Sequence, residues 1–179
     1  MSLFLATLLP GLLLLALGVP LLLDHRGFVM ALERLPRSTT AAAIFFGAGA
    51  AWYLWAVWHL SVADFGEYRT LLTIGFAIVA VLAFKYVPDF LAVRGLCVLV
   101  LMSATPLLGA AYMEYQYPQR LFMVSLVYLL IVLAIWLGAS PFRLRDFFER
   151  LFARPARIRT FGGLMVAYGA LLLVVAFTY

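Results

Sequence analysis

Six long apolar runs constrain the fold of this chain more than any other feature of its sequence. A helix needs about 20 predominantly apolar residues to cross the hydrocarbon core of a bilayer. The predicted spans are Leu3–Leu23, Thr39–Leu60, Thr70–Val87, Phe90–Tyr112, Arg120–Leu137 and Thr160–Thr178. Because the apolar residues are continuous and do not alternate with polar ones, the runs predict helices and not the strands of a membrane barrel.

The composition excludes an ordinary soluble domain. Of the 179 residues, 66% are hydrophobic and only 12% are charged, whereas soluble domains have roughly 45–50% and about 25%. A water-soluble core of this size cannot bury the excess of apolar side chains. We therefore predict an all-α integral membrane protein, in which residues 1–179 form a single polytopic transmembrane domain of six helices.

The cationic side chains are distributed unevenly among the connections between the runs. Eleven of the 13 lie in or beside the first, third and fifth connections: Arg26, Arg34, Arg37, Lys85, Arg94, Arg143, Arg145, Arg150, Arg154, Arg157 and Arg159. Only Arg69 and Arg120 lie in the second and fourth connections. Since Lys and Arg are enriched in cytoplasmic loops, this pattern predicts a plasma-membrane protein, in a bacterium the inner membrane, with both termini outside.

The fifth connection contains the strongest local pattern. Ser140-Pro141 is typical of a helix start, and apolar residues then recur at three- and four-residue spacing as far as Phe152. This pattern predicts a short amphipathic helix near 141–153, lying in the cytoplasmic interface before the last span. We expect the arginines of this region to contact anionic lipids or a partner protein. They are Arg143, Arg145, Arg150, Arg154, Arg157 and Arg159. Nucleic acid is excluded, because no base-stacking module accompanies the charge.

Two spans contain small residues at the spacing of one helix face. Ala43, Gly47 and Ala51 follow each other at four-residue intervals, and Gly163 and Ala167 have the same relation. Such stripes let helix backbones approach closely in a membrane, where no hydrophobic driving force brings helices together. They are the predicted helix-packing faces, and a partner helix in the same chain or in another chain fits the pattern.

The fourth run carries the candidate ligand-binding residues. Arg94 lies about one turn inside the cytoplasmic end, and Ser103 and Thr105 lie deeper, next to Pro106. A proline leaves a carbonyl of the preceding turn without its partner, and hydroxyl groups nearby can compensate. Arg94, Ser103 and Thr105 therefore form a candidate site for an apolar or anionic small molecule, although a tolerated helix kink explains the same residues.

No pattern in the chain indicates a metal, a cofactor or a catalytic centre. Cys97 is the only cysteine, and His25 and His59 lie at opposite ends of neighbouring spans, where they cannot ligate one metal. The deep apolar stretches contain no Asp or Glu, which argues against a carboxylate-based proton relay. We predict no bound cofactor and no metal site.

Two stretches of the sequence resemble each other. Glu33-Arg34-Leu35 recurs as Glu149-Arg150-Leu151, and Phe46-Gly47 recurs as Phe161-Gly162 at nearly the same offset. Both copies would cross the membrane in the same direction, as in a parallel repeat. A duplicated hairpin and a chance match between apolar sequences are both compatible with these residues.

Three functions are compatible with the sequence. The first is a non-catalytic accessory, scaffold or assembly subunit of a larger inner-membrane complex, which binds other membrane subunits or further copies of itself. The second is a small carrier or binding subunit for an apolar or anionic molecule. The third, an enzyme that acts on lipid or quinone, has the least support, because no nucleophile and base are paired in the sequence.

Overall fold

The computed structural model covers residues 1–179 and describes every side chain other than that of Val62. Every regular element in this described part is helical. Six helices are long and apolar enough to cross a membrane, which supports the predicted polytopic α-helical membrane protein. They are α1 (Leu3–Leu22), α3 (Thr39–Trp58), α4 (Arg69–Tyr86), α5 (Leu91–Ala111), α6 (Leu121–Ala139) and α8 (Pro155–Ala176).

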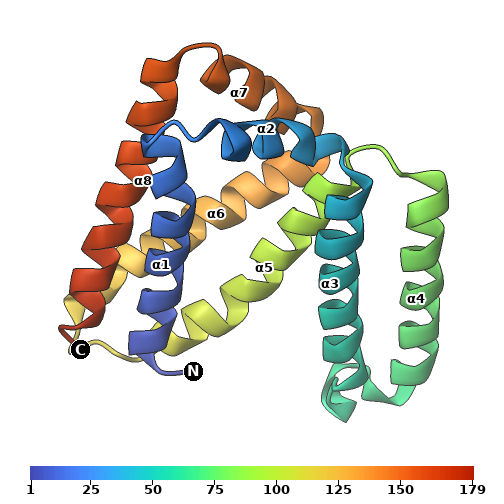
Figure 1. Cartoon of the computed structure of the whole chain (residues 1–179). Coiled ribbons are helices and arrows are strands. Elements are labelled where there is room, and N and C mark those ends of the chain that lie inside the picture. Colours follow the sequence, from blue (N-terminus) through green and yellow to red (C-terminus); the bar gives the residue numbers. More distant parts are fainter.

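Two shorter helices, α2 (Arg26–Arg34) and α7 (Phe142–Phe152), lie across the end of the molecule away from both termini (Figure 1). They contact each other there. The remaining regular elements are single 3₁₀ turns in the connections: η1 (Leu35–Arg37), η2 (Val62–Asp64), η3 (Gly66–Tyr68) and η4 (Pro118–Arg120).

The start of α8 differs from the sequence-based prediction. The helix begins at Pro155, whereas the apolar run predicted a start at Thr160. Proline suits the first helical position, because its fixed φ angle fits the helix and its missing N–H would have no partner there. Arg157 and Arg159 therefore lie in the first turns of the last span, whereas the prediction placed them in a loop.

Helices α1 and α8 form the most extensive helix pair, and glycines set their separation. Gly11 and Gly18 of α1 lie opposite Gly169 and Gly162 of α8 in antiparallel register. A Cβ atom on Gly162 would lie 2.9 Å from the carbonyl oxygen of Gly18, and one on Gly169 would lie 2.9 Å from that of Gly11. These four glycines allow the two backbones to touch.

Helix α5 makes a second close contact, with α3. A Cβ atom on Gly95 would lie 2.6 Å from the carbonyl carbon of Phe45, and one on Gly49 would lie 3.1 Å from the side chain of Val98. Helix α5 also contacts α1 and α6. It therefore connects the α1–α8 pair to α3 and is the central span of the bundle.

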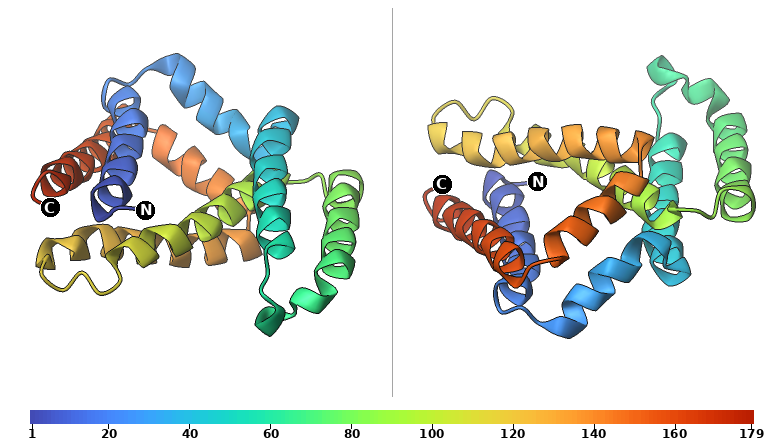
Figure 2. Two further views of the ribbon diagram at one scale, coloured as in Figure 1. Left: turned by 90° about the horizontal axis from the view of Figure 1, so that it is seen from below. Right: turned by 90° about the horizontal axis from the view of Figure 1, so that it is seen from above.

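The views from either end show three neighbouring helix pairs: α1 with α8, α5 with α6, and α3 with α4 (Figure 2). A cluster of buried apolar side chains lies between α1, α5, α6 and α8, and Met123 and Leu172 are fully buried in it. Helix α4 is peripheral and has no buried residue. It packs on α3 through edge-to-face ring contacts, of which Phe46–Phe84 is one.

Helices α6 and α8 lie close together near the termini and diverge toward α7 (Figures 1 and 2). Near the termini, the Tyr168 hydroxyl donates to the carbonyl oxygen of Phe122 at 2.9 Å, and the Gln119 amide donates to the Thr178 hydroxyl at 3.2 Å. At the opposite end, the 11 residues of α7, about 16 Å of helix, bridge the two spans. The spans thus form a wedge that is widest beneath α7.

Replacing Tyr168 by Phe tests the closed end of this wedge. The change removes the bond to the Phe122 carbonyl, and we expect the free energy of unfolding in detergent to fall by about 0.5–1.5 kcal/mol. Tyr128→Phe is the control, since Tyr128 is exposed on α6. Equal unfolding midpoints for the two variants would contradict the assigned bond.

The two matching stretches of sequence lie in equivalent units of the chain. Each belongs to a series of span, short helix and span, α1–α2–α3 in one case and α6–α7–α8 in the other. The packing of the two units differs, because α8 lies against α1 whereas α3 lies against α5. The order of elements thus agrees with a duplication, but the corresponding helices of the two units pack against non-equivalent neighbours.

Candidate functional site

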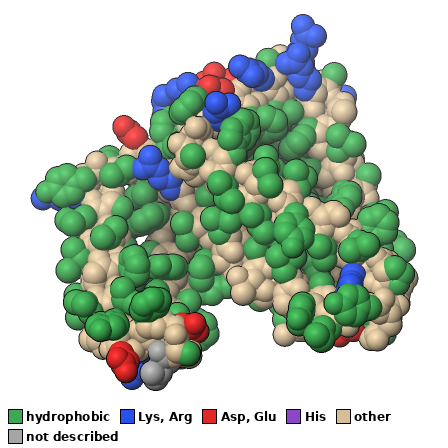
Figure 3. Space-filling model, turned by 180° about the vertical axis from the view of Figure 1, so that it is seen from behind, with side chains coloured by type: hydrophobic (Ala, Val, Ile, Leu, Met, Phe, Trp, Pro, Cys, Tyr) green, Lys and Arg blue, Asp and Glu red, His purple; other side chains and the backbone are tan. Residues whose placement is uncertain are grey.

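The end of the molecule formed by α2 and α7 is strongly cationic. Figure 3 shows Lys and Arg side chains gathered there, above a broad, largely hydrophobic band. Acidic side chains are interspersed among them, so the charge available to a ligand depends on which arginines already have a carboxylate partner.

Two of the six arginines between Arg143 and Arg159 are paired within the chain. Arg145 donates to Asp146 at 2.7 Å and lies 3.4 Å from Glu149. The hydrogen bond with Asp146 raises the pKa of Arg145 above its usual value. Arg159 lies 3.7 Å from Asp24, at the end of α1. These two arginines stabilise charges within the chain and are the least available to a ligand.

The other four arginines have no carboxylate partner among the described side chains, and all four are exposed. Arg143 lies over the ring of Trp136, 4.8 Å from its centroid, as cations do on aromatic faces. Arg157 donates to the backbone carbonyl oxygen of Arg150 at 2.9 Å. Arg154 is the residue before α8. The four arginines without a carboxylate partner are thus Arg143, Arg150, Arg154 and Arg157.

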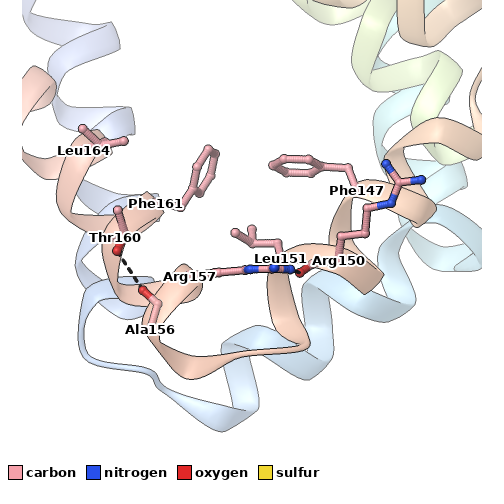
Figure 4. Close-up of a pocket in the computed structure, with 8 residues that line it drawn as sticks. All are labelled: Phe147, Arg150, Leu151, Ala156, Arg157, Thr160, Phe161 and Leu164. Carbon is pink, nitrogen blue, oxygen red and sulfur yellow. Dashed lines mark hydrogen bonds between the residues drawn. The ribbon is translucent and has the colours of Figure 1, made fainter.

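Arg150 and Arg157 lie at an apolar groove between α7 and α8 (Figure 4). The groove has a volume of about 440 Å³, and we call it the α7–α8 groove. It is lined chiefly by Phe147, Arg150 and Leu151 of α7 and by Arg157, Phe161 and Leu164 of α8. Phe147 and Phe161 meet edge to face, with centroids 5.6 Å apart.

A second cavity, of about 480 Å³, lies on the α6 side of α7, and we call it the α6–α7 cavity. It shares Phe147, Arg150 and Phe161 with the α7–α8 groove and adds Trp136 and Arg143. The two hollows therefore adjoin at the Phe147–Phe161 ring pair, and Arg150 lines both. Both lie beneath α7, in the wide part of the wedge between α6 and α8.

The structure does not bring Arg94, Ser103 and Thr105 together. Ser103 lies nine positions after Arg94 in α5, about 14 Å along the helix. Ser103 donates to the carbonyl oxygen of Val100 in its own helix at 2.8 Å, and Thr105 is exposed. Arg94 is half-buried, and none of the three lines a described pocket.

The small-residue stripe predicted on α3 does not pack against another helix in the described part of the chain. Ala43 and Ala51 are exposed, and a Cβ atom on Gly47 would meet nothing within 4 Å. The packing face of α3 instead contains Ala42 and Gly49, which are buried. The predicted stripe therefore faces away from the bundle.

The predicted stripe of α8 lies one position beside the residues that pack. A Cβ atom on Gly163 would make only ordinary contact with Leu22, at 3.7 Å, and Ala167 is exposed. The close contacts belong to Gly162 and Gly169, which match Gly18 and Gly11 on α1. The signal for them was the equal spacing of these two glycine pairs, about two helical turns in each helix.

Each histidine ring contacts the backbone of its own segment, and the cysteine is buried between two helices. The His25 ring accepts from the backbone N–H of Phe28 at 3.3 Å and caps α2, and the His59 ring lies 2.8 Å from the carbonyl oxygen of Trp55. Cys97 is buried between α5 and α6. Among the described residues, no group of three or more His, Cys, Asp or Glu side chains is placed to hold a metal ion.

Comparison of the chain with protein-family models, with curated proteins and with solved structures gave no match. The functional assignment therefore depends on the geometry of the molecule.

Proposed function

We propose that the protein is a non-catalytic accessory or assembly subunit of a larger complex in the plasma membrane, in a bacterium the inner membrane. Its partner would be another membrane protein, bound through a transmembrane helix that lies along α3. The observation that carries this proposal is the outward-facing stripe of Ala43, Gly47 and Ala51. A helix face of this kind accepts a second backbone at short distance.

The use of small residues elsewhere in the chain supports this assignment. Gly162 and Gly95 each lie against the backbone of a neighbouring helix, and a Cβ on either would collide with it. The stripe on α3 has the same composition but no such neighbour. The adjacent helix α4 has no buried residue, so this side of the bundle also presents uncovered apolar side chains to a partner.

The proposed orientation follows from the positions of the arginines. With α2 and α7 in the cytoplasmic interface, the cationic end faces the cytoplasm and both termini lie outside. The apolar residues of α7 then contact lipid and the bundle, while its arginines reach the headgroups or a cytoplasmic surface of the partner. This arrangement leaves the hydrophobic band between the two ends within the bilayer.

A leucine at Gly47 tests the partner surface. Gly47→Leu should leave the chain folded, because the position is open, but it should keep a partner helix at a distance. We expect proteins that copurify with the tagged wild-type chain from its native membrane to fall by about tenfold or more in the variant, as measured by quantitative mass spectrometry.

Gly109→Leu is the matched control. Gly109 is also an open helical glycine, on α5, with nothing within 4 Å of a Cβ. The proposal requires that this variant retain its partners. Equal retention of partners by both variants would place the partner surface elsewhere. If the wild-type chain copurifies only with further copies of itself, the protein is a homo-oligomer and not an accessory subunit.

The hypothesis of a carrier or binding subunit receives support from a different place than predicted. The α7–α8 groove combines apolar walls with exposed arginines, whereas Arg94 and Ser103 lie far apart on α5. Under this hypothesis, Arg150→Ala would abolish transport, and Arg94→Ala would leave it unchanged. An uptake assay in native membranes separates the two variants.

A further inference from the structure

We propose that the α7–α8 groove and the adjoining α6–α7 cavity bind one anionic phospholipid. Its phosphate would be held by Arg150 and Arg157, and its acyl chains would lie on either side of the Phe147–Phe161 ring pair. This site does not depend on the partner surface of α3, and each proposal can fail without the other.

The first argument is the charge at the rim. Arg150 and Arg157 are exposed and have no carboxylate partner among the described side chains, in contrast to Arg145 and Arg159. The hydrogen bond from Arg157 to the backbone of Arg150, at 2.9 Å, fixes one guanidinium beside the other residue. Figure 4 shows the exposed Arg150 side chain extending away from Arg157, so Arg150 must change rotamer before both guanidinium groups can bind one phosphate.

The second argument is the chemistry of the walls. Phe147, Phe161 and the buried Leu151 give the α7–α8 groove an apolar interior. Leu164 lies at its edge with 65% of its surface exposed, about two and a half turns into α8. The groove is thus open sideways, at the depth where acyl chains lie. A water-soluble phosphate compound would use the arginines but would leave these walls uncovered.

The third argument is the division of the space beneath α7. The two hollows have similar volumes, about 440 and 480 Å³, and they adjoin at the ring pair. Arg150 lines both. A ligand with one anionic head and two apolar chains fits this arrangement, with the head at Arg150 and one chain in each hollow.

The test measures lipid bound to the purified full-length chain by native mass spectrometry in a neutral detergent. Phosphatidylglycerol and phosphatidylcholine with the same acyl chains are titrated separately. We expect the wild type to retain one phosphatidylglycerol and to bind phosphatidylcholine at least about tenfold more weakly. Inorganic phosphate in millimolar excess should not displace the lipid. Equal binding of the two lipids, or displacement by phosphate, would overturn the proposal.

Two variants with equal charge separate a site from a general surface attraction. Arg150→Gln/Arg157→Gln should bind phosphatidylglycerol at least about tenfold more weakly than the wild type. Arg26→Gln/Arg34→Gln loses the same charge at the same end, but both residues belong to α2 and neither lines a described pocket. We expect at most a threefold loss here. Equal losses in both variants would show that anionic lipid is attracted by the overall positive charge of this end and not bound at a specific site.

A third variant keeps both arginines and fills the groove. Leu164→Trp places a large ring at the edge of the α7–α8 groove, at an exposed position that tolerates the change. We expect it to lose phosphatidylglycerol as strongly as the arginine variant. Leu129→Trp, at an exposed position of α6 outside both hollows, should bind like the wild type. Unchanged binding by Leu164→Trp would contradict the placement of the acyl chain.

Discussion

Gly162→Ala should destabilise the protein, although alanine is the better helix former. A helical Gly→Ala change at an open site stabilises by up to about 1 kcal/mol. At Gly162, however, the added Cβ would collide with the backbone of α1 at Leu22, and it would lie 2.9 Å from the carbonyl oxygen of Gly18. Backbone atoms cannot move aside as a flexible side chain can, so α1 and α8 must separate. We expect a loss of about 2–3 kcal/mol in the free energy of unfolding.

The neighbouring glycine provides the control. A Cβ on Gly163 would meet only the end of the Leu22 side chain, at 3.7 Å. Gly163→Ala should therefore be neutral or slightly stabilising. Both variants can be compared by thermal unfolding in the same detergent, with circular dichroism as the readout. A loss at Gly163 and none at Gly162 would show that the α8 face predicted from the sequence is the packing face after all.

Gly95→Ala should have an effect of similar size, because α5 is the central span. The added Cβ would collide with the backbone of Phe46, and it would lie 2.6 Å from the carbonyl carbon of Phe45. Separation of α5 from α3 would also disturb the contacts of α5 with α1 and α6. We expect about 2–3 kcal/mol of destabilisation in the same unfolding assay.

The control for Gly95 lies in the same helix. Gly109 has no atom within 4 Å of a Cβ, so Gly109→Ala should gain the small stabilisation of a helical alanine. If both variants unfold at the same temperature, the close approach of α3 and α5 is not a feature of the protein in solution.

The positions of the spans were predictable from sequence because the apolar runs end at residues with a clear local role. Ser38, for example, precedes α3 and accepts a hydrogen bond from the backbone N–H of Ala41 at 3.1 Å. The start of α8 was missed because Arg157 and Arg159 were assigned to a loop by their charge. Long arginine side chains can lie in the first turns of a span and still reach water.

The packing faces were less predictable, because Gly162 and Gly163 are adjacent and composition does not tell which one faces a neighbour. The four-residue rule selected Gly163 with Ala167, whereas the structure uses Gly162 with Gly169. That choice depends on the glycines of α1, which lie far away in the sequence. A comparison of glycine spacing between runs would have found the pair.

The walls of the α7–α8 groove also escaped prediction. Phe161 and Leu164 belong to an apolar run, in which a residue that lines a pocket cannot be distinguished from one that faces lipid. They form a wall only because α7 crosses the space between the diverging spans α6 and α8. The sequence identified the arginines as candidate ligand contacts. Only the structure shows which of them are paired with a carboxylate of the same chain, as Arg159 is with Asp24.

The most direct test of the proposed function is the mass of the intact assembly. The wild-type chain would be extracted from its native membrane in mild detergent and measured by native mass spectrometry. The proposal predicts a complex that contains one or more foreign subunits in fixed stoichiometry with this chain. A bare monomer, or a homo-oligomer without other proteins, would contradict the role of an accessory subunit.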